Sequence, residues 1–178
     1  MSARKEAAQH AGAARPATIV GLVDAFEARL AVVASRFPLL ETKTDVRSPS
    51  IVDGWLPPKP GGDAEQFPFL IVRPANGSDS EQNANENAVA VVKVIIGTYS
   101  DTDDGWRDVA MLIQAIRQDL DEAPAIDGTA FEHIGPLIWE IPEQQARPQW
   151  FGIVTANWQL PRPSRVEALN PGFDFEEA

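Results

Sequence analysis

Three aspartates lie within the four residues 101–104, and such a cluster of carboxylates could bind a cation or act in acid–base catalysis. They are Asp101, Asp103 and Asp104. A calcium loop of the EF-hand type needs carboxylates at alternate positions, glycine at the sixth and glutamate at the twelfth. Counted from Asp101, the sixth position holds Trp106 and the twelfth holds Leu112. The spacing does not fit this metal loop, and no base or nucleophile lies nearby to support a catalytic cluster.

The same segment fits the start of a helix. After Gly105, apolar residues recur at helical spacing and would form one face: Trp106, Val109, Leu112, Ile113, Ile116 and Leu120. Asp103 or Asp104 could cap the free backbone amides, and their negative charge suits the positive end of the helix dipole. We therefore interpret Asp103, Asp104 and Gly105 as a turn and helix cap between a strand and a helix.

Other residues that could do chemistry are few and isolated. The chain has no cysteine and two histidines, His10 and His133, and neither has a second ligand at zinc-binding spacing. No phosphate-binding glycine loop and no serine nucleophile elbow occurs. Glu132, Glu140 and Glu143 are close in sequence, but alternation along a strand favours a solvated face for them. We expect no catalytic residue, no metal site and no cofactor.

Composition predicts a folded, acidic protein. The chain has 178 residues, of which 44% are hydrophobic, so it is long enough for one domain with a core of its own. Its net charge is −11, with 26 acidic and 15 basic side chains, whereas nucleic-acid binders normally carry a basic face. No apolar run approaches the roughly 18 residues of a membrane span. We therefore expect neither a membrane nor a sequence-specific nucleic-acid partner.

Periodicity predicts an α+β fold. Apolar residues at helical spacing predict a helix over 18–37, capped by Thr18 and ended by Pro38. The short apolar segment 67–74, bounded by prolines, and the segment 88–100, rich in β-branched residues, predict an antiparallel pair of strands. Segment 88–100 is apolar on both faces, as in a strand covered on both sides. The helix after Gly105 and two further strands over 131–141 and 150–160 complete a mainly antiparallel four-stranded sheet with two helices packed on it.

The predicted domain spans 18–161 and has a long loop at 41–66 and two extended arms. The arms are a flexible N-terminal segment, 1–17, and a C-terminal segment, 162–178. Trp55 and Leu56 in the proline-rich loop either fold back onto the core or contact a partner. Phe173 and Phe175 in the acidic C-terminal arm are costly to leave in water, which makes them candidate assembly contacts.

Gly152 follows two aromatic residues and lies at the start of a predicted strand. A glycine there is typical of a bulge or of a close backbone approach. We therefore expect a side chain at this position to disturb the fold.

Two short motifs carry a family resemblance. An acid-glycine-aromatic-x-aspartate turn at 104–108 opens the second helix, and a proline-x-aromatic-aromatic-glycine turn at 148–152 opens the last strand. With the strand and helix around them, over about residues 67–161, they resemble the tail terminator, or tail completion, proteins of tailed phages and prophages. The resemblance implies a small α+β subunit of the virion tail or neck, assembled in the host cytoplasm, with no catalytic residue.

That family resemblance also implies partners. Six copies would form a homo-hexameric ring that caps the finished tail tube and joins it to the head-side connector. The partners would be the tail tube protein, a connector or other neck protein and, where the tail is contractile, the tail sheath. Two alternatives stay open at this point: another head–tail joining protein, and a small soluble enzyme or ligand-binding protein with a pocket beside Trp55, Trp106 and Trp139.

Overall fold

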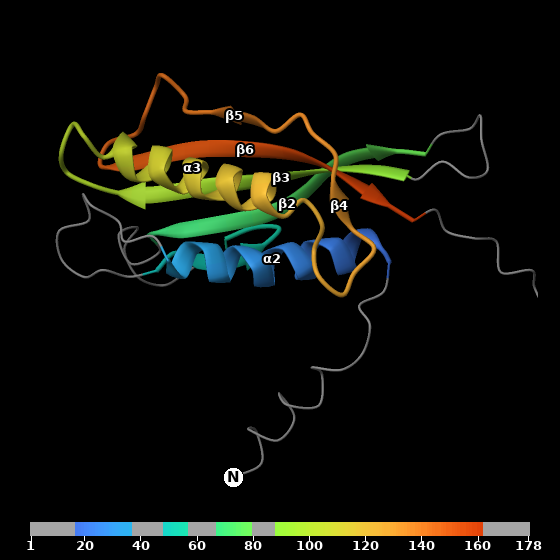
Figure 1. Ribbon diagram of the computed structural model, residues 1–178. Helices are drawn as coiled ribbons and strands as arrows, with labels where there is room; N and C mark the ends of the chain where they lie inside the picture. The colour runs from blue at the N-terminus through green and yellow to red at the C-terminus, as the bar shows by residue number, and fades with distance from the viewer. Residues whose placement is uncertain (1–16, 37–47, 57–66, 80–87, 162–178) are drawn as a thin grey trace, which may run out of the picture.

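The computed structural model describes residues 17–36, 48–56, 67–79 and 88–161. These residues form two helices and six strands (Figure 1): α2 (Ile19–Ser35), β1 (Ser50–Asp53), β2 (Phe69–Ser78), β3 (Ala88–Tyr99), α3 (Trp106–Glu122), β4 (Glu132–His133), β5 (Ile138–Glu140) and β6 (Gln149–Leu160). All six strands belong to one curled sheet with the order β1-β2-β3-β6-β4, and β5 also pairs with β6. The predicted α+β class is confirmed.

The centre of the sheet is built from its three longest strands. β3 pairs antiparallel with β2, from Phe69 opposite Gly97 to Ser78 opposite Val89, as predicted. β3 also pairs antiparallel with β6 along its whole length, from Ala88 opposite Leu160 to Tyr99 opposite Gln149. β3 is rich in β-branched residues, which favour a strand because such side chains pack well on a pleated surface.

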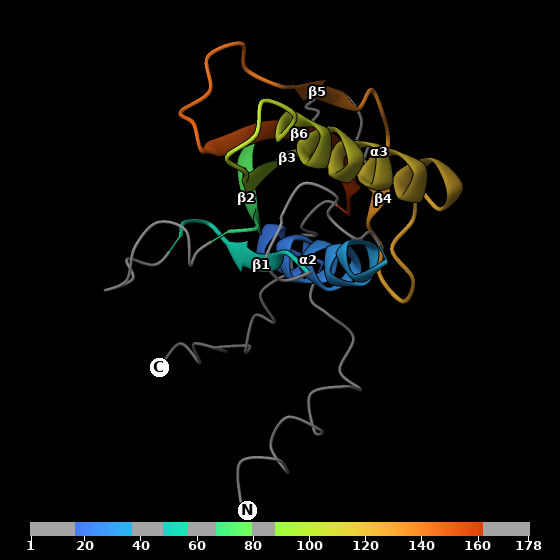
Figure 2. The ribbon, with the colours of Figure 1, turned by 90° about the vertical axis from the view of Figure 1, so that its left-hand side faces the viewer.

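Both helices lie against the same face of the sheet (Figure 2). Thr18 caps α2 as predicted, since its hydroxyl accepts a hydrogen bond from the amide of Gly21 at 3.1 Å. The even-numbered residues of β3 and β6 point toward the helices and are buried. Phe26 of α2 packs edge-on against Trp158 of β6, with ring centroids 4.8 Å apart. One hydrophobic core therefore joins α2, α3 and the sheet.

The sheet differs in detail from the expected four antiparallel strands. Ser50–Asp53, inside the predicted loop 41–66, forms β1 and pairs parallel with β2. The predicted strand over 131–141 is instead two short strands, β4 and β5, which both pair with β6. The predicted helix end at Pro38 lies outside the described residues, as do residues 41–47 and 57–66 of that loop, residues 1–16 of the N-terminal arm and the whole C-terminal arm.

Candidate functional site

The first helix turn of α3 is anchored on β6 by a buried tryptophan. Trp150 is 5% exposed, and its indole Nε1 donates a hydrogen bond to the carbonyl of Ser100 at 3.0 Å. A side chain at Gly105 would collide with this indole, although Gly105 itself has ordinary helical backbone angles. Glycine is therefore needed here for space rather than for conformational freedom.

The predicted capping hydrogen bond from Asp103 or Asp104 is not formed. Gly105 is the N-cap residue of α3, and no side chain caps the helix. Oδ1 of Asp104 instead accepts from Nε of Arg107 at 3.0 Å, and Asp103 pairs with Arg147. Both pairs are exposed to solvent, so the aspartates bind arginines rather than backbone amides. The predicted turn at 101–105 is present, but the prediction that Asp103 or Asp104 caps α3 with its side chain was wrong.

Gly152 lies in a regular part of β6, opposite Ile96, rather than in a bulge. A Cβ atom there would collide with Cγ1 of Val109 and would lie 3.3 Å from Cδ1 of Ile113, both on α3. The close approach is therefore that of a helix to the strand. Gly105 and Gly152, one from each motif, together let α3 lie close against β6.

The opposite face of the sheet carries no described helix. We call it the open face, and it is formed by the odd-numbered residues of the central strands: Ile71 and Arg73 of β2, Val89, Val91, Lys93 and Ile95 of β3, and Phe151, Ile153, Thr155, Asn157 and Gln159 of β6. Most of them are partly exposed, while the alternate residues are buried under the helices. The open face is more apolar than a solvated sheet face needs to be.

An aromatic cluster covers one end of the open face. Phe67 lies 5.0 Å from Phe69, 6.0 Å from Tyr99 and 5.9 Å from Phe151, measured between ring centroids. The ring of Phe69 occupies the space where Gly97 would carry a side chain. Next to this cluster, Ile71, Ile95 and Ile153 lie side by side across β2, β3 and β6; we call them the isoleucine row, and Glu140 of β5 lies at its end.

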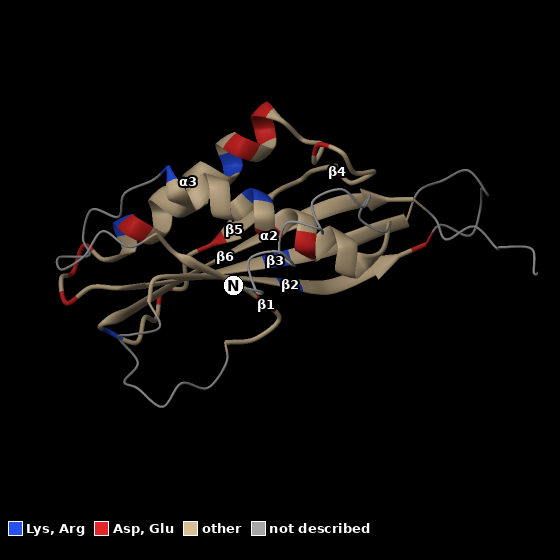
Figure 3. Ribbon diagram, turned by 90° about the horizontal axis from the view of Figure 1, so that it is seen from below, with Lys and Arg blue, Asp and Glu red and all other residues tan. Residues whose placement is uncertain are grey.

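Two cations follow the isoleucine row. Arg73 and Lys93 face each other on β2 and β3 (the blue segments of these strands in Figure 3), and Thr155 lies beyond Lys93 on β6. Neither cation forms an ion pair with an acidic side chain in the described part of the chain. The guanidinium of Arg73 lies 4.4 Å from the ring centroid of Trp55. We call Arg73, Lys93 and Thr155 the cation row.

The candidate assembly residues are placed only in part. Trp55 is 75% exposed, so it does not fold back into the core, and Leu56 beside it is partly exposed. Phe173 and Phe175 lie outside the described residues. The three tryptophans Trp55, Trp106 and Trp139 are on separate elements and are all exposed, and the hollows found between described residues are lined by other side chains.

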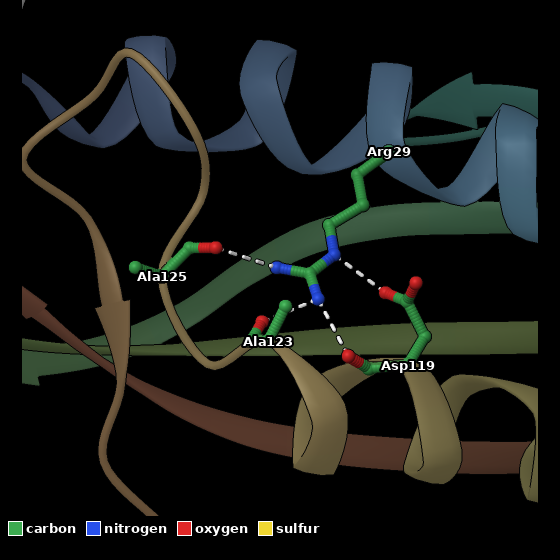
Figure 4. A network of polar contacts seen from close by, with 4 residues as sticks. All are labelled: Arg29, Asp119, Ala123 and Ala125. Carbon is green, nitrogen blue, oxygen red and sulfur yellow. Dashed lines mark hydrogen bonds and ion pairs between the residues drawn. The ribbon is translucent and has the colours of Figure 1, made fainter.

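Arg29 joins the two helices in a network that sequence reasoning missed (Figure 4). Its Nε donates to Oδ2 of Asp119 at 2.5 Å, and its two other nitrogens donate to three backbone carbonyls, those of Asp119, Ala123 and Ala125. The carbonyls at the end of a helix lack partners within the helix, and a cation there suits the helix dipole. Arg29 thus holds α2 against the C-terminal end of α3.

Two titratable side chains have shifted pKa values. Burial raises the pKa of Glu27, and nearby Asp53 and Asp24 raise it further. Burial lowers the pKa of His133, and Arg29 adds to the effect. The ring of His133 packs edge-on against Trp158 at 5.9 Å. Neither residue belongs to a set of three or more potential metal ligands, since no such group occurs among the described residues.

Comparison with known proteins does not identify a family. No family model matches the chain, and no curated protein matches it. One solved structure is 16% identical, covers 80% of this chain and 94% of its own, and superimposes with a TM-score of 0.47. An identity and a TM-score this low support no assignment of function. None of the helices described is long and apolar enough to cross a membrane.

Proposed function

We propose that this chain is a structural subunit of a phage tail, a tail terminator that forms a ring on the tail tube and joins it to the head-side connector. The open face carries this proposal. Phe69 and Ile71 on this face are buried, but Ile95, Phe151 and Ile153 are partly exposed. Their apolar area stays in water unless a partner covers it, and such faces mark protein contacts. The chain then acts through assembly rather than through catalysis.

The two resembling motifs support the same proposal. Residues 104–108 and 148–152 are about 40 positions apart in the sequence, yet Trp150 packs on Gly105 and Gly152 lies under Val109. The amide of Ser100 also donates to the carbonyl of Pro148 at 2.9 Å. Their residues are used for packing, which is consistent with a family whose shared features are structural. The ring, the tube and the connector are the partners we propose.

The decisive experiment measures the mass and shape of the full-length chain. Light scattering after size exclusion, followed by negative-stain electron microscopy, should show a closed ring, which we expect to be a hexamer. Added to purified tail tubes of the same phage, the chain should bind one end and stop further tube growth. A strict monomer at all concentrations, or a ring that leaves tube growth unchanged, would refute the tail terminator role.

One observation favours a second candidate, a small ligand-binding protein. A groove of about 1030 Å³ lies between the start of α2, the C-terminal ends of β2 and β6 and the N-terminal end of β3. It is lined largely by apolar side chains that include Val20, Val89 and Leu160. An apolar small molecule would suit it, because ligand pockets are mostly hydrophobic with few polar groups. A monomer that carries a bound metabolite through purification, detected by native mass spectrometry, would favour this candidate.

A further inference from the structure

The open face combines three properties that together define what it could bind. Its aromatic cluster and isoleucine row are apolar, its cation row is positive, and successive rows are about 6.8 Å apart because they are two residues apart on each strand. The positive charge is unusual in a chain of net charge −11. An extended segment with two apolar side chains followed by an acid, each two residues apart, would match all three rows.

The last residues of this chain have that pattern. Phe173, Phe175 and Glu177 are spaced by two residues, so in an extended segment their side chains project to the same side. Asp174 and Glu176 would project to the other side, toward water. The match is specific in order: Phe173 over the aromatic cluster, Phe175 over the isoleucine row and Glu177 over the cation row.

We propose that the open face is the docking site for the C-terminal segment 173–177 of a second copy of this chain. Phe175 packs against Ile95 and Ile153, and the carboxylate of Glu177 pairs with Lys93 and Arg73. The docking site rests on one part of the proposed function, namely that copies of this chain associate with one another. It does not require that the assembly belongs to a phage tail. It assigns the apolar face and the terminal phenylalanines to each other.

The direction of β6 favours a neighbouring copy over the same copy. β6 runs from the aromatic end of the open face to Leu160, at the opposite end of the sheet (Figure 1). The chain therefore leaves the sheet heading away from the rows that the segment would occupy. The 12 residues from Arg162 to Phe173 span at most about 40 Å, which is enough to reach a neighbour, whereas docking on the same copy requires a full reversal.

Charge contributes to the specificity of this docking. Apolar packing alone would tolerate several registers along the rows, whereas a carboxylate over the cation row fixes one. In the described residues Lys93 and Arg73 have no competing carboxylate in an ion pair, so the site is electrostatically unmatched until a partner binds. Reversing one charge should weaken docking, and reversing its partner as well should restore it.

Photo-crosslinking in the full-length chain tests the proposal. A benzoylphenylalanine replaces Phe175, and isotopically heavy and light chains are mixed, irradiated and mapped by mass spectrometry. We expect heavy-to-light crosslinks that map to 88–99 or 149–160. Crosslinks confined to chains of one isotope, or mapping to the helices, would overturn the proposal.

Charge reversal provides the matched controls. Lys93→Glu should lower the crosslink yield by about tenfold, because it replaces an attraction with a repulsion. Glu177→Arg in the same chain should restore the yield, whereas Glu176→Arg, an identical charge change on the neighbouring residue, should not. Equal rescue by both variants would overturn the predicted alternation. Arg117→Glu on the exposed side of α3 should leave the yield unchanged, and circular dichroism confirms that each variant is folded.

The outcomes separate this proposal from the proposed function. A ring whose crosslinks map away from the open face refutes the docking site and leaves the ring intact. An open dimer or chain of copies whose crosslinks lie on the open face supports docking and refutes the closed ring. A monomer that yields only crosslinks within one isotope refutes both.

Discussion

Among the charged side chains of the described residues, Arg29 is the one whose loss should destabilise the fold most, and Arg29→Met tests this. The substitution keeps most of the aliphatic stem but removes every donor of the guanidinium. Four acceptors lose their partner: the carboxylate of Asp119 and the carbonyls of Asp119, Ala123 and Ala125. The side chain of Arg29 is only 13% exposed and that of Asp119 is 25% exposed, so water replaces these hydrogen bonds incompletely.

The magnitude follows from these contacts. A hydrogen bond to a charged group contributes about 1.5–3 kcal/mol, and a cation at a helix C-terminus about 0.3–1 kcal/mol. The contributions are not additive, and the carbonyls of Ala123 and Ala125 belong to exposed residues that water can reach. We expect a loss of about 2–3 kcal/mol in the free energy of unfolding, which lowers the melting temperature by about 4–12 °C for a domain of this size.

Urea unfolding followed by tryptophan fluorescence measures this loss. Arg117→Met is the matched control, because Arg117 is exposed on α3 and, among the described residues, its guanidinium donates only to the side chain of Gln114. We expect this variant to change the free energy of unfolding by no more than about 0.5 kcal/mol. Arg29→Lys should fall between the two, since an ammonium cannot reproduce the fork of a guanidinium. If Arg29→Met and Arg117→Met unfold at the same urea concentration, the network contributes no net stability and the reasoning is refuted.

Four further outcomes are expected. Gly152→Val should cost about 1–3 kcal/mol by overpacking against Val109, and Val109→Ala in the same chain should recover part of it in thermal melts. Asp103→Ala with Asp104→Ala should cost less than about 1 kcal/mol, because it breaks exposed ion pairs rather than a cap, and should leave metal content by elemental analysis unchanged. Glu27→Gln should raise the free energy of unfolding at neutral pH. The pKa of Glu27 is higher in the folded state than in the unfolded state, so the wild-type protein loses stability as the pH rises from the ordinary glutamate pKa through the folded-state pKa. Denaturant titrations across this pH range should show the loss in the wild type and not in Glu27→Gln. A chain truncated after Leu160 should keep its circular dichroism signal yet fail to close rings, and normal rings from it would show that the C-terminal arm is dispensable.

Periodicity in the sequence was enough to predict both helices and the three long strands. A repeat of apolar residues reports directly on the side of an element that must be buried. It could not predict β1, because Ser50–Asp53 is short, lies in a proline-rich segment and is specified by its pairing with β2. The open face shows the same limit. The apolar sequence of β3 predicted that both faces of the strand are covered, but such a sequence shows only that a face is apolar and not which molecule covers it.

The polar contacts were harder to predict than the apolar ones. Asp103 and Asp104 have the residue types of helix caps, but Arg147 and Arg107 compete for their carboxylates, and one of those arginines is remote in sequence. Arg29 binds mainly backbone carbonyls about 90 residues away, which every sequence offers equally. Gly105 and Gly152 were identified by motif, while their steric reason required the positions of Trp150 and Val109.

The pairing of β3 with β6 has a consequence for how the protein is made. The two central strands are separated by α3, β4 and β5, so their ladder closes a chain segment of about 50 residues. Such pairings of high contact order form slowly, because the loop must be closed before the ladder stabilises it. During synthesis, β2 and β3 leave the ribosome well before Leu160, and their apolar surfaces stay unpaired until the last strand emerges. The central ladder is therefore expected to form only after Leu160 has left the ribosome, and premature contact between nascent copies is the hazard that chaperones would have to suppress.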